Sequence, residues 1–176
     1  ENAIGGSGND TFIGNAAANI FIGNGGTDTF HTGGINGGGW HSFNYGGSSY
    51  VMSWRDATDR LVGVEQISDG GQTIAGLETF DPLAYGASYN DLAAAFRNNA
   101  DAAFQHYLTY GFNEGREASF SAEQYLANWA DLQTAFGTDT AAATQHFLQY
   151  GIDEHRLAED PLDYIASYAD LIAAFG

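Results

Sequence analysis

The sequence of 176 residues predicts an α+β protein, in which a short parallel β-roll (a β-solenoid) with a strand-rich cap precedes an all-α array of helical hairpin repeats. Three observations support this expectation: a nine-residue repeat at the start, a middle segment without helical periodicity, and a later repeat of about forty residues rich in Tyr, Phe and Leu. We expect the β-roll at 1–39, the cap or linker at 40–79 and the helical repeats at 80–176, with copies at 80–119, 120–158 and, in part, 159–176.

The first region consists of three units of nine residues, GGSGNDTFI (5–13), GNAAANIFI (14–22) and GNGGTDTFH (23–31). The eighth place of the units holds Phe12, Phe21 and Phe30, and the sixth place holds Asp10, Asn19 and Asp28. A short period with one large apolar residue per unit is typical of a β-solenoid, in which each unit supplies a turn and a very short strand. Glycine allows such turns to adopt left-handed dihedral angles and to direct carbonyl oxygens inward.

The spacing of the acidic residues predicts a cation site. In such a roll alternate units stack on the same edge, which would place Asp10 beside Asp28. Two neighbouring carboxylates repel each other unless a cation lies between them. Oxygen ligands without nitrogen or sulfur favour Ca²⁺ over a transition metal, and the chain contains no cysteine. A glycine-rich flexible linker is the alternative, but a linker does not carry phenylalanine at a fixed period.

The unit GGSGNDTFI resembles the GGxGxDxUx nonapeptide of the hemolysin-type (RTX) calcium-binding repeat, where U is a large apolar residue. The stretch ENAIGGSGND…IGNAAAN is also similar to the start of the C-terminal β-roll of serralysin-type secreted metalloproteases. The resemblance implies that two stacked turns share one ion through carbonyl and aspartate oxygens. The implied ligands are Gly5, Ser7 and Asp10 from one turn, and Asn24, Gly26 and Asp28 from the other.

The opposite edge of the predicted roll departs from the repeat. The second unit lacks the paired glycines and has Asn19 in place of an aspartate. Its expected neighbours are Glu1 and the segment 32–40, and that segment has no acid at the matching place. We therefore expect a single calcium site.

Charge narrows the classes of partner. The chain has 5 Lys and Arg against 22 Asp and Glu, a net charge of -17, which excludes a nucleic-acid-binding protein and disfavours binding to anionic lipid. No apolar run approaches the length of a membrane span. The chain begins at Glu1 without a basic and apolar leader, so we expect a fragment or a processed product.

The middle region is expected to be rich in strands. SYVMSW and RLVGVEQI are interpreted as strands, and DGG as a turn before QTIAGL. The phrase LVGVEQISDGG resembles a segment that closes such β-rolls. The side chains expected to cover the open end are Trp40, Tyr50, Val51, Trp54, Leu61, Val62 and Ile67. His31 and His41 lie nearby, and we expect them to pack against aromatic rings rather than to bind metal.

The last region repeats an aromatic stripe with steps of 4, 3 and 4, which defines one face of an α-helix. The stripes are Tyr85, Tyr89, Leu92, Phe96; Tyr125, Trp129, Leu132, Phe136; and Tyr164, Tyr168, Leu171, Phe175. A second helix is expected through AAFQHYLTYG and AATQHFLQYG, ended by Gly111 and Gly151 in the left-handed conformation. The start signals are Asp81–Pro82, Thr138–Asp139 and Asp160–Pro161. Similar repeats accompany secreted bacterial RTX proteins, a resemblance that implies architecture only.

The sequence shows no catalytic motif: there is no HExxH, no P-loop and no GxSxG nucleophile elbow. His106 and His146, which match in the two full copies, are expected to be hydrogen-bonding residues rather than ligands. Glu114–Arg116 and Glu154–Arg156 are expected to form ion pairs that hold loops.

We therefore expect a non-catalytic, calcium-binding C-terminal module of a secreted bacterial exoprotein, such as a serralysin-like protease. The resemblance implies that it folds on calcium binding outside the cell and supports type I secretion. Besides calcium, its expected partners are the catalytic domain of the parent protein or a cell-surface partner. The alternative is an adhesion or partner-binding module that uses the aromatic-rich helical repeats, and a large apolar patch on them would favour it.

Overall fold

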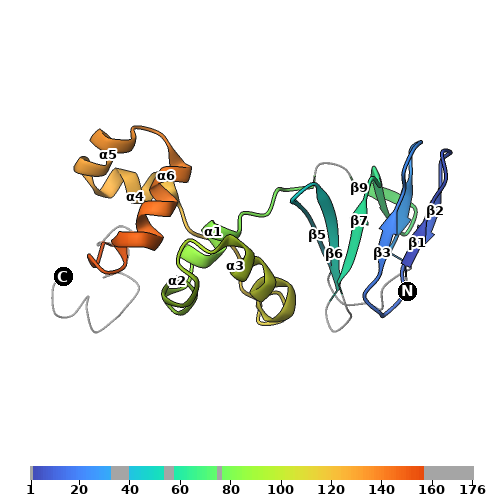
Figure 1. Ribbon diagram of the computed structural model, residues 1–176, viewed down its shortest axis with the longest axis horizontal. Helices are drawn as coiled ribbons and strands as arrows, with labels where there is room; N and C mark the ends of the chain where they lie inside the picture. The colour runs from blue at the N-terminus through green and yellow to red at the C-terminus, as the bar shows by residue number, and fades with distance from the viewer. Residues whose placement is uncertain (1, 33–39, 54–57, 75–76, 157–176) are drawn as a thin grey trace. The chain divides into compact units, whose positions relative to one another are not determined.

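The computed structural model describes residues 2–32, 40–53, 58–74 and 77–156 (Figure 1). The chain forms two compact units: residues 1–80 with 108–116, and residues 81–107 with 117–176. The first unit carries the strands, and we call it the strand-bearing unit. The second carries the short helices, and we call it the helical unit. Each is described by itself below. The predicted division at 39 and 79 stays a prediction.

The strands of the first unit form two sheets. One sheet has the order β1-β3-β7-β6-β5 and the other has the order β2-β4-β8-β9 (Figure 1). The strands are β1 (Asn2–Ile4), β2 (Thr11–Ile13), β3 (Ile20–Ile22), β4 (Thr29–His31), β5 (Trp40–Tyr45), β6 (Ser48–Ser53), β7 (Asp59–Val62), β8 (Gln66–Asp69) and β9 (Gln72–Ile74). Successive nine-residue units contribute to alternate sheets, because each unit contains one three-residue strand and one turn.

The phenylalanine of each unit is buried between the two sheets, as the repeat predicts. Phe12 of β2 is paired with Phe30 of β4 in parallel register, and Phe21 of β3 lies between their rings, at centroid distances of 5.4 and 5.2 Å. The core is completed by Val51, Leu61, Val64 and Ile67. In a three-residue strand only the middle side chain points inward, so a period of nine places one aromatic ring per unit in this core.

The predicted parallel β-roll with a separate cap is wrong, because both sheets are mixed. β7 continues the first sheet parallel to β3, but β6 pairs antiparallel to β7, and β5 pairs antiparallel to β6. In the second sheet β8 is parallel to β4, while β9 is antiparallel to β8. The two-residue turn at Gly46 and Gly47, with φ of 57° and 75°, reverses the chain between β5 and β6. Strands expected to cover the end of a roll therefore extend the sheets themselves.

Two features of the middle region, a break between strands and a turn, depend on glycine residues with positive φ angles. The segment RLVGVEQI, predicted as one strand, is divided into β7 and β8 in different sheets, because Gly63 has φ of 60° between them. The turn predicted at DGG is confirmed by Gly70 and Gly71, with φ of 54° and 86°. Of the predicted covering residues, Val51, Leu61 and Ile67 belong to the buried core, and Trp54 lies outside the described residues.

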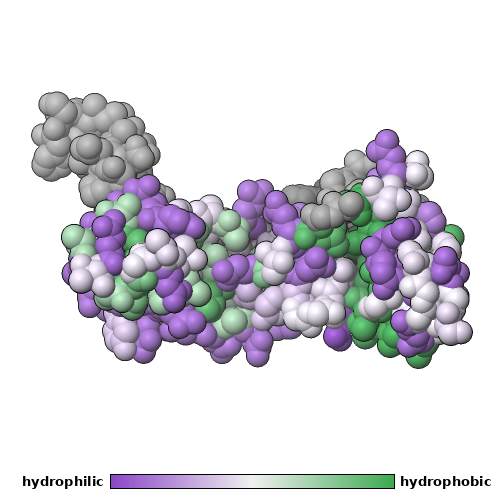
Figure 2. Space-filling model, turned by 90° about the horizontal axis from the view of Figure 1, so that it is seen from above, coloured by the Kyte–Doolittle hydropathy of each residue, from purple (hydrophilic) through white to green (hydrophobic). Residues whose placement is uncertain are grey.

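The second unit contains short helices of six or seven residues. They are α1 (Pro82–Ala87), α2 (Asn90–Phe96), α3 (Ala100–His106), α4 (Ala122–Asn128), α5 (Ala130–Phe136) and α6 (Thr140–His146). A π-helical turn follows α3 and another follows α6, η1 (Tyr107–Gly111) and η2 (Phe147–Gly151). On the face shown in Figure 2, hydrophilic and hydrophobic residues are interspersed over these helices, whereas hydrophobic residues gather in patches over the strands.

The predicted all-α array of helical hairpins is also wrong. The helix expected from Tyr85 to Phe96 is two helices, because Tyr89 has extended dihedral angles, φ -136° and ψ 125°. Trp129, with φ -131° and ψ 99°, separates α4 from α5 in the same way. Each described copy therefore has three short helices where a hairpin of two was expected. The partial third copy, including Asp160–Pro161, lies outside the described residues.

Tertiary hydrogen bonds explain the break before α2. The hydroxyl oxygen of Ser88 accepts hydrogen bonds from the main-chain N–H groups of Ser119 and Phe120, at 2.8 and 2.9 Å. The hydroxyl of Tyr89 accepts one from the N–H of Glu117 at 2.9 Å. These hydrogen bonds hold residues 117–120 against Ser88 and Tyr89, where α1 ends. Both helices still direct apolar residues to one core, so the sequence keeps a helical period across the break.

The helix starts predicted at Asp81–Pro82 and Thr138–Asp139 are confirmed, but the predicted helix ends are not. The carboxylate of Asp81 accepts hydrogen bonds from Leu83 and Ala84, and that of Asp139 accepts one from Ala142. Gly111 and Gly151 are the last residues of π-helical turns rather than left-handed caps. The positive φ angles occur four residues later, 68° at Gly115 and 56° at His155.

Candidate metal centre

Two stacked turns precede β2 and β4, and we call them turn A (residues 5–10) and turn B (residues 23–28). Their strands pair in parallel with Thr11 opposite Thr29, so Asp10 lies beside Asp28. The main-chain N–H of Asp10 donates a 2.7 Å hydrogen bond to Oδ1 of Asp28, and the N–H of Gly6 donates one of 2.6 Å to Oδ2 of Asp10. The structure thus brings the two predicted aspartates together, while their role as ligands stays a prediction.

The other predicted ligands lie in the same two turns. Nδ2 of Asn24 donates to the carbonyl oxygen of Gly5 at 2.8 Å, and the N–H of Gly25 donates to the carbonyl oxygen of Gly6 at 3.3 Å. Asn24 and Gly26 have φ of 72° and 118°, and a Cβ on Gly26 would lie 2.5 Å from the carbonyl oxygen of Gly8. Ser7 faces Gly25, whose added Cβ would lie 3.7 Å from the Cα of Ser7. The turns are therefore in direct main-chain contact.

The carboxylate of Asp28 is the least satisfied polar group of this site. Asp28 is 0% exposed, and its Oδ2 has no hydrogen-bond partner among the described residues. A Cβ added to Gly23 would collide with this Oδ2 and also with the carbonyl oxygen of Gly63, so both oxygens approach the same point. A buried acceptor without a donor is destabilising, and a second acceptor beside it adds repulsion. A hard cation bound by oxygen would remove both penalties, so the residues present fit Ca²⁺.

Sequence reasoning missed a third acid on this edge. Gln66 of β8 is opposite Thr29 of β4, so Glu65 follows Asp28 along the stack. The N–H of Asp28 donates a 2.9 Å hydrogen bond to Oε2 of Glu65. Glu65 lies outside the nine-residue repeat, but it precedes buried Ile67 by two residues, as Asp28 precedes Phe30. That offset was the signal that could have identified it.

On the opposite edge, Asn19 has a different hydrogen-bond partner from the neighbours predicted for it. Asn19 donates from its main-chain N–H and from Nδ2 to Oδ1 of Asp59, at 2.9 and 3.0 Å. Asp59 belongs to β7 and is 2% exposed, and burial raises the pKa of its carboxyl above the ordinary value of 3.8. The expected neighbours of Asn19 were Glu1 and 32–40, of which Glu1 and 33–39 lie outside the described residues. This edge pairs one carboxylate with an amide rather than with a second carboxylate.

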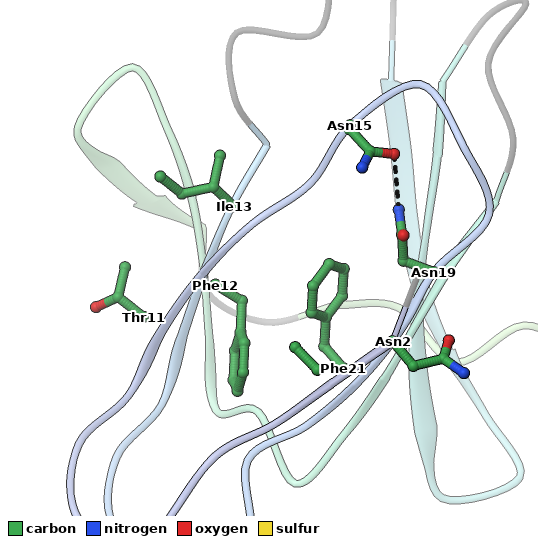
Figure 3. Close-up of a pocket in the computed structure, with 8 residues that line it drawn as sticks. Asn2, Thr11, Phe12, Ile13, Asn15, Asn19 and Phe21 are labelled. Carbon is green, nitrogen blue, oxygen red and sulfur yellow. Dashed lines mark hydrogen bonds between the residues drawn. The ribbon is translucent and has the colours of Figure 1, made fainter.

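A pocket of about 250 Å³ opens beside the same edge, between β1, β2 and β3 (Figure 3). The rings of Phe12 and Phe21 line it, and at one side Nδ2 of Asn19 donates to Oδ1 of Asn15 at 3.1 Å. Its lining contains asparagine, threonine and apolar side chains but no acid, base or histidine. It therefore offers no acid–base pair for catalysis.

Three histidines, His41, His106 and His146, take hydrogen-bonding or packing positions. Nδ1 of His106 is 2.9 Å from the hydroxyl of Tyr85, and Nδ1 of His146 is 3.0 Å from that of Tyr125. The ring of His41 packs 5.5 Å from that of Phe43. These contacts confirm the predicted hydrogen bonding of His106 and His146 and the predicted packing of His41 against an aromatic ring.

The ion pairs predicted at the ends of the two copies are present, at 2.8 Å for Glu114–Arg116 and 2.6 Å for Glu154–Arg156. Arg156 also contacts Asp131 at 2.9 Å and lies 4.8 Å above the ring of Trp129. Its guanidinium group holds the pKa of the Asp131 carboxyl below its usual range. These contacts fasten one loop to α5 and the residue before it, which is a structural role.

Within the part of the chain that the structure describes, no three His, Cys, Asp or Glu side chains form a compact metal-binding group. A calcium site made largely of carbonyl oxygens needs only two carboxylates, as turns A and B provide. No helix among the described residues is long and apolar enough to cross a membrane. Comparison of the chain with protein-family models, with curated proteins and with solved structures found no match.

Proposed function

We propose that this chain is a non-catalytic calcium-binding module, in which one Ca²⁺ ion held between turns A and B stabilises the strand-bearing unit. The observation that carries the proposal is the carboxylate of Asp28, which is fully buried, accepts a hydrogen bond from turn A at Oδ1 and has no partner at Oδ2 in the part of the chain that the structure describes. A buried carboxylate that stays ionised needs a positive charge beside it. None of the residues described around it supplies one, and a divalent cation would.

Six residues of the two turns would hold the ion. Asp10 and Asp28 supply carboxylate oxygens, and the backbone supplies the remaining oxygens through Gly5, Ser7, Asn24 and Gly26. Ca²⁺ accepts such a set because it tolerates six to eight oxygen ligands in a flexible geometry. Mg²⁺ requires a tighter octahedral shell and gives up its waters reluctantly, so it fits a carbonyl cage poorly.

The cellular setting is part of the proposal. A chain of net charge -17 gains stability from divalent cations, and extracellular calcium modules bind with dissociation constants of about 0.1 to 1 mM. Such an affinity keeps the site empty inside a cell and filled outside it. Together with the resemblance of GGSGNDTFI to the RTX repeat, this supports a secreted bacterial exoprotein, such as a serralysin-like protease, exported by type I secretion.

Isothermal titration of the whole chain with CaCl₂ tests the proposal. We expect Asp28→Asn to abolish binding between turns A and B, since the amide keeps the size of the side chain but removes its charge. The matched control is Asp101→Asn, an exposed acid in the first turn of α3 that should leave calcium binding unchanged. Wild-type calcium affinity in both Asp10→Asn and Asp28→Asn would overturn the proposal.

The alternative of an adhesion module receives no specific support. Among the described residues of the helical repeats, the exposed large apolar side chains are Tyr110 and Tyr150, at 58% and 50%. Single exposed tyrosines, one in each copy, are common on soluble proteins and do not by themselves form a patch. The mixed surface over the helices in Figure 2 agrees with this.

A further inference from the structure

We propose that two copies of this chain associate end to end through the free edges of β1 and β2. Each sheet of the strand-bearing unit then continues into the same sheet of the second copy. The inference goes beyond the proposed calcium function and uses none of the oxygens that carry it.

The two sheets end together at β1 and β2 (Figure 1). Each of these strands has one neighbour, β3 or β4, and a second side without a strand. The far edge of the first sheet, at β5, is covered instead. There the N–H of Asn44 donates to the carbonyl oxygen of Glu78 at 2.8 Å, and the N–H of Phe80 donates to that of Asn44 at 2.9 Å. Among the described residues, the edges of β1 and β2 have no such cover.

The main-chain groups on these edges are directed outward. A strand turns the N–H and C=O groups of successive residues to alternate sides. The N–H of Gly14 donates to a residue of β4 at 3.2 Å, and that of Gly5 donates to a residue of β3 at 2.7 Å. The residues one and three places before each glycine therefore present their groups to the free edge: Thr11 and Ile13 in β2, and Asn2 and Ile4 in β1.

These edges lack the features that keep strands apart. Proteins protect free edges with lysine, proline, bulges or inward-pointing charges. The strands read NAI and TFI, and their isoleucines, Ile4 and Ile13, are 71% and 68% exposed. The pocket between the strands has no charged residue in its lining, although the chain has a net charge of -17. Two copies therefore meet little electrostatic repulsion at this pocket.

The presence of two free edges favours a second copy over a single foreign strand. The edges belong to different sheets, and packed sheets lie about 10 Å apart, so one added strand would pair with one edge and leave the other open. A second copy supplies both strands at the required separation. A two-fold axis pairs each strand with its own equivalent, and such a pairing is antiparallel.

The pocket gives this pairing a core. Ala3 and Phe12 occupy the same place in successive nine-residue units, but Ala3 has no ring. The pocket of about 250 Å³ lies beside Phe12 and Phe21, with Ala3 in its lining (Figure 3). With the two-fold axis between the equivalent strands, Phe12 of the second copy enters this space. It continues the row of rings that Phe12, Phe21 and Phe30 form at centroid distances of 5.4 and 5.2 Å.

Sedimentation equilibrium of the whole chain in millimolar CaCl₂, from micromolar to millimolar protein, tests the proposal. The contact is small, so we expect a weak dimer in reversible exchange with the monomer. Ile13→Lys should raise the dissociation constant about tenfold or more, because each lysine enters the contact twice and is a residue that blocks edge pairing. The matched control is Thr73→Lys, at an exposed position of β9, which should dimerise as the wild type does.

A cysteine cross-link tests the register. The chain has no cysteine, so Ala3→Cys introduces a single thiol. Across the axis the Cα atoms of the two equivalent residues lie about 4.5 Å apart, which a disulfide spans. Mild oxidation with diamide should therefore give a covalent dimer on a non-reducing gel, and Thr73→Cys should give none.

The possible results separate this proposal from the calcium site. A dimer that Ile13→Lys weakens and Ala3→Cys traps supports the end-to-end contact, provided that far-ultraviolet circular dichroism shows both variants folded. If Ile13→Lys is unfolded, Ile4→Lys takes its place with the same expected loss. A wild type that stays monomeric at every concentration but binds calcium overturns the contact and leaves the proposed function. A dimer indifferent to the lysine and not trapped by the cysteine also overturns it.

Discussion

Asp28 joins the two turns through one carboxylate oxygen and leaves the other unsatisfied. Its Oδ1 accepts a 2.7 Å hydrogen bond from the main-chain N–H of Asp10, while its Oδ2 is buried without a partner. The first contact sets the stacking of the turns without metal. The second leaves a buried acceptor unsatisfied among the described residues, so under the proposed function the stability of the strand-bearing unit should depend on calcium.

Calcium should raise the thermal unfolding temperature of the strand-bearing unit. At about ten times its dissociation constant, a ligand stabilises the folded state by roughly 1.4 kcal/mol per site. Scanning calorimetry in millimolar CaCl₂ and in chelator measures the shift, and an equal concentration of MgCl₂ should produce much less. Hydrogen exchange should show protection by calcium in residues 2–32 and 58–74, with little change in 117–156. An unfolding profile that is indifferent to calcium contradicts the proposed function.

Gly23→Ala should destabilise the strand-bearing unit and weaken calcium binding. The added methyl group would collide with Oδ2 of Asp28 and with the main-chain oxygen of Gly63, and a backbone atom cannot move aside at low cost. Overpacking of this kind costs about 1–3 kcal/mol. Chemical denaturation with and without calcium measures both effects.

The matched control for Gly23→Ala is Gly8→Ala. A Cβ on Gly8 would have no heavy atom within 4 Å, and its backbone needs no left-handed conformation. We expect wild-type stability and wild-type calcium affinity from this variant. Equal losses from both substitutions would show that glycine content, rather than the oxygens around Gly23, matters here.

Asp59→Asn should stabilise the protein at neutral pH in the presence of chelator. Burial raises the pKa of the Asp59 carboxyl in the folded state, so the stability that this group contributes is present below its unfolded pKa and is lost as pH rises through the folded value. Asparagine is neutral at every pH and can still accept both hydrogen bonds from Asn19. Thermal unfolding from pH 3 to pH 8 should therefore show a gain over the wild type that grows as pH rises and vanishes at the acidic end. A variant less stable than the wild type at neutral pH contradicts this prediction.

Tyr125→Phe should destabilise the helical unit by about 1 kcal/mol, because it leaves Nδ1 of His146 without its hydroxyl partner. Burial raises the pKa of Tyr125 to about 12, so the phenol stays protonated at neutral pH. Urea denaturation measures it, and Tyr85→Phe should behave alike through His106. Tyr150→Phe, at an exposed position, is the control and should change stability little.

Local sequence patterns predicted burial, turns and helix starts correctly where a single residue determines the local structure. Burial of Phe12, Phe21 and Phe30 followed from their period, since a three-residue strand can turn only one side chain inward. The turn at Gly70 and Gly71 and the helix starts at Asp81 and Asp139 followed from short-range stereochemistry and hydrogen bonding. The proximity of Asp10 and Asp28 followed from an equal spacing of units on one edge.

The sequence by itself thus determined the burial of the three phenylalanines, the turn at Gly70 and Gly71, and the proximity of Asp10 and Asp28. Tertiary structure alone decided the rest, because the deciding partners are distant along the chain. Glu65 reaches Asp28 across 37 residues through pairing of β8 with β4, and no repeat marks it. The antiparallel additions that make both sheets mixed depend on strand pairing, and the break at Tyr89 depends on bonds to residues 117–120. Such tertiary contacts override the local conformational preference of the chain. The segment predicted as one helix therefore forms two helices, and the strands expected to form a cap extend the two sheets.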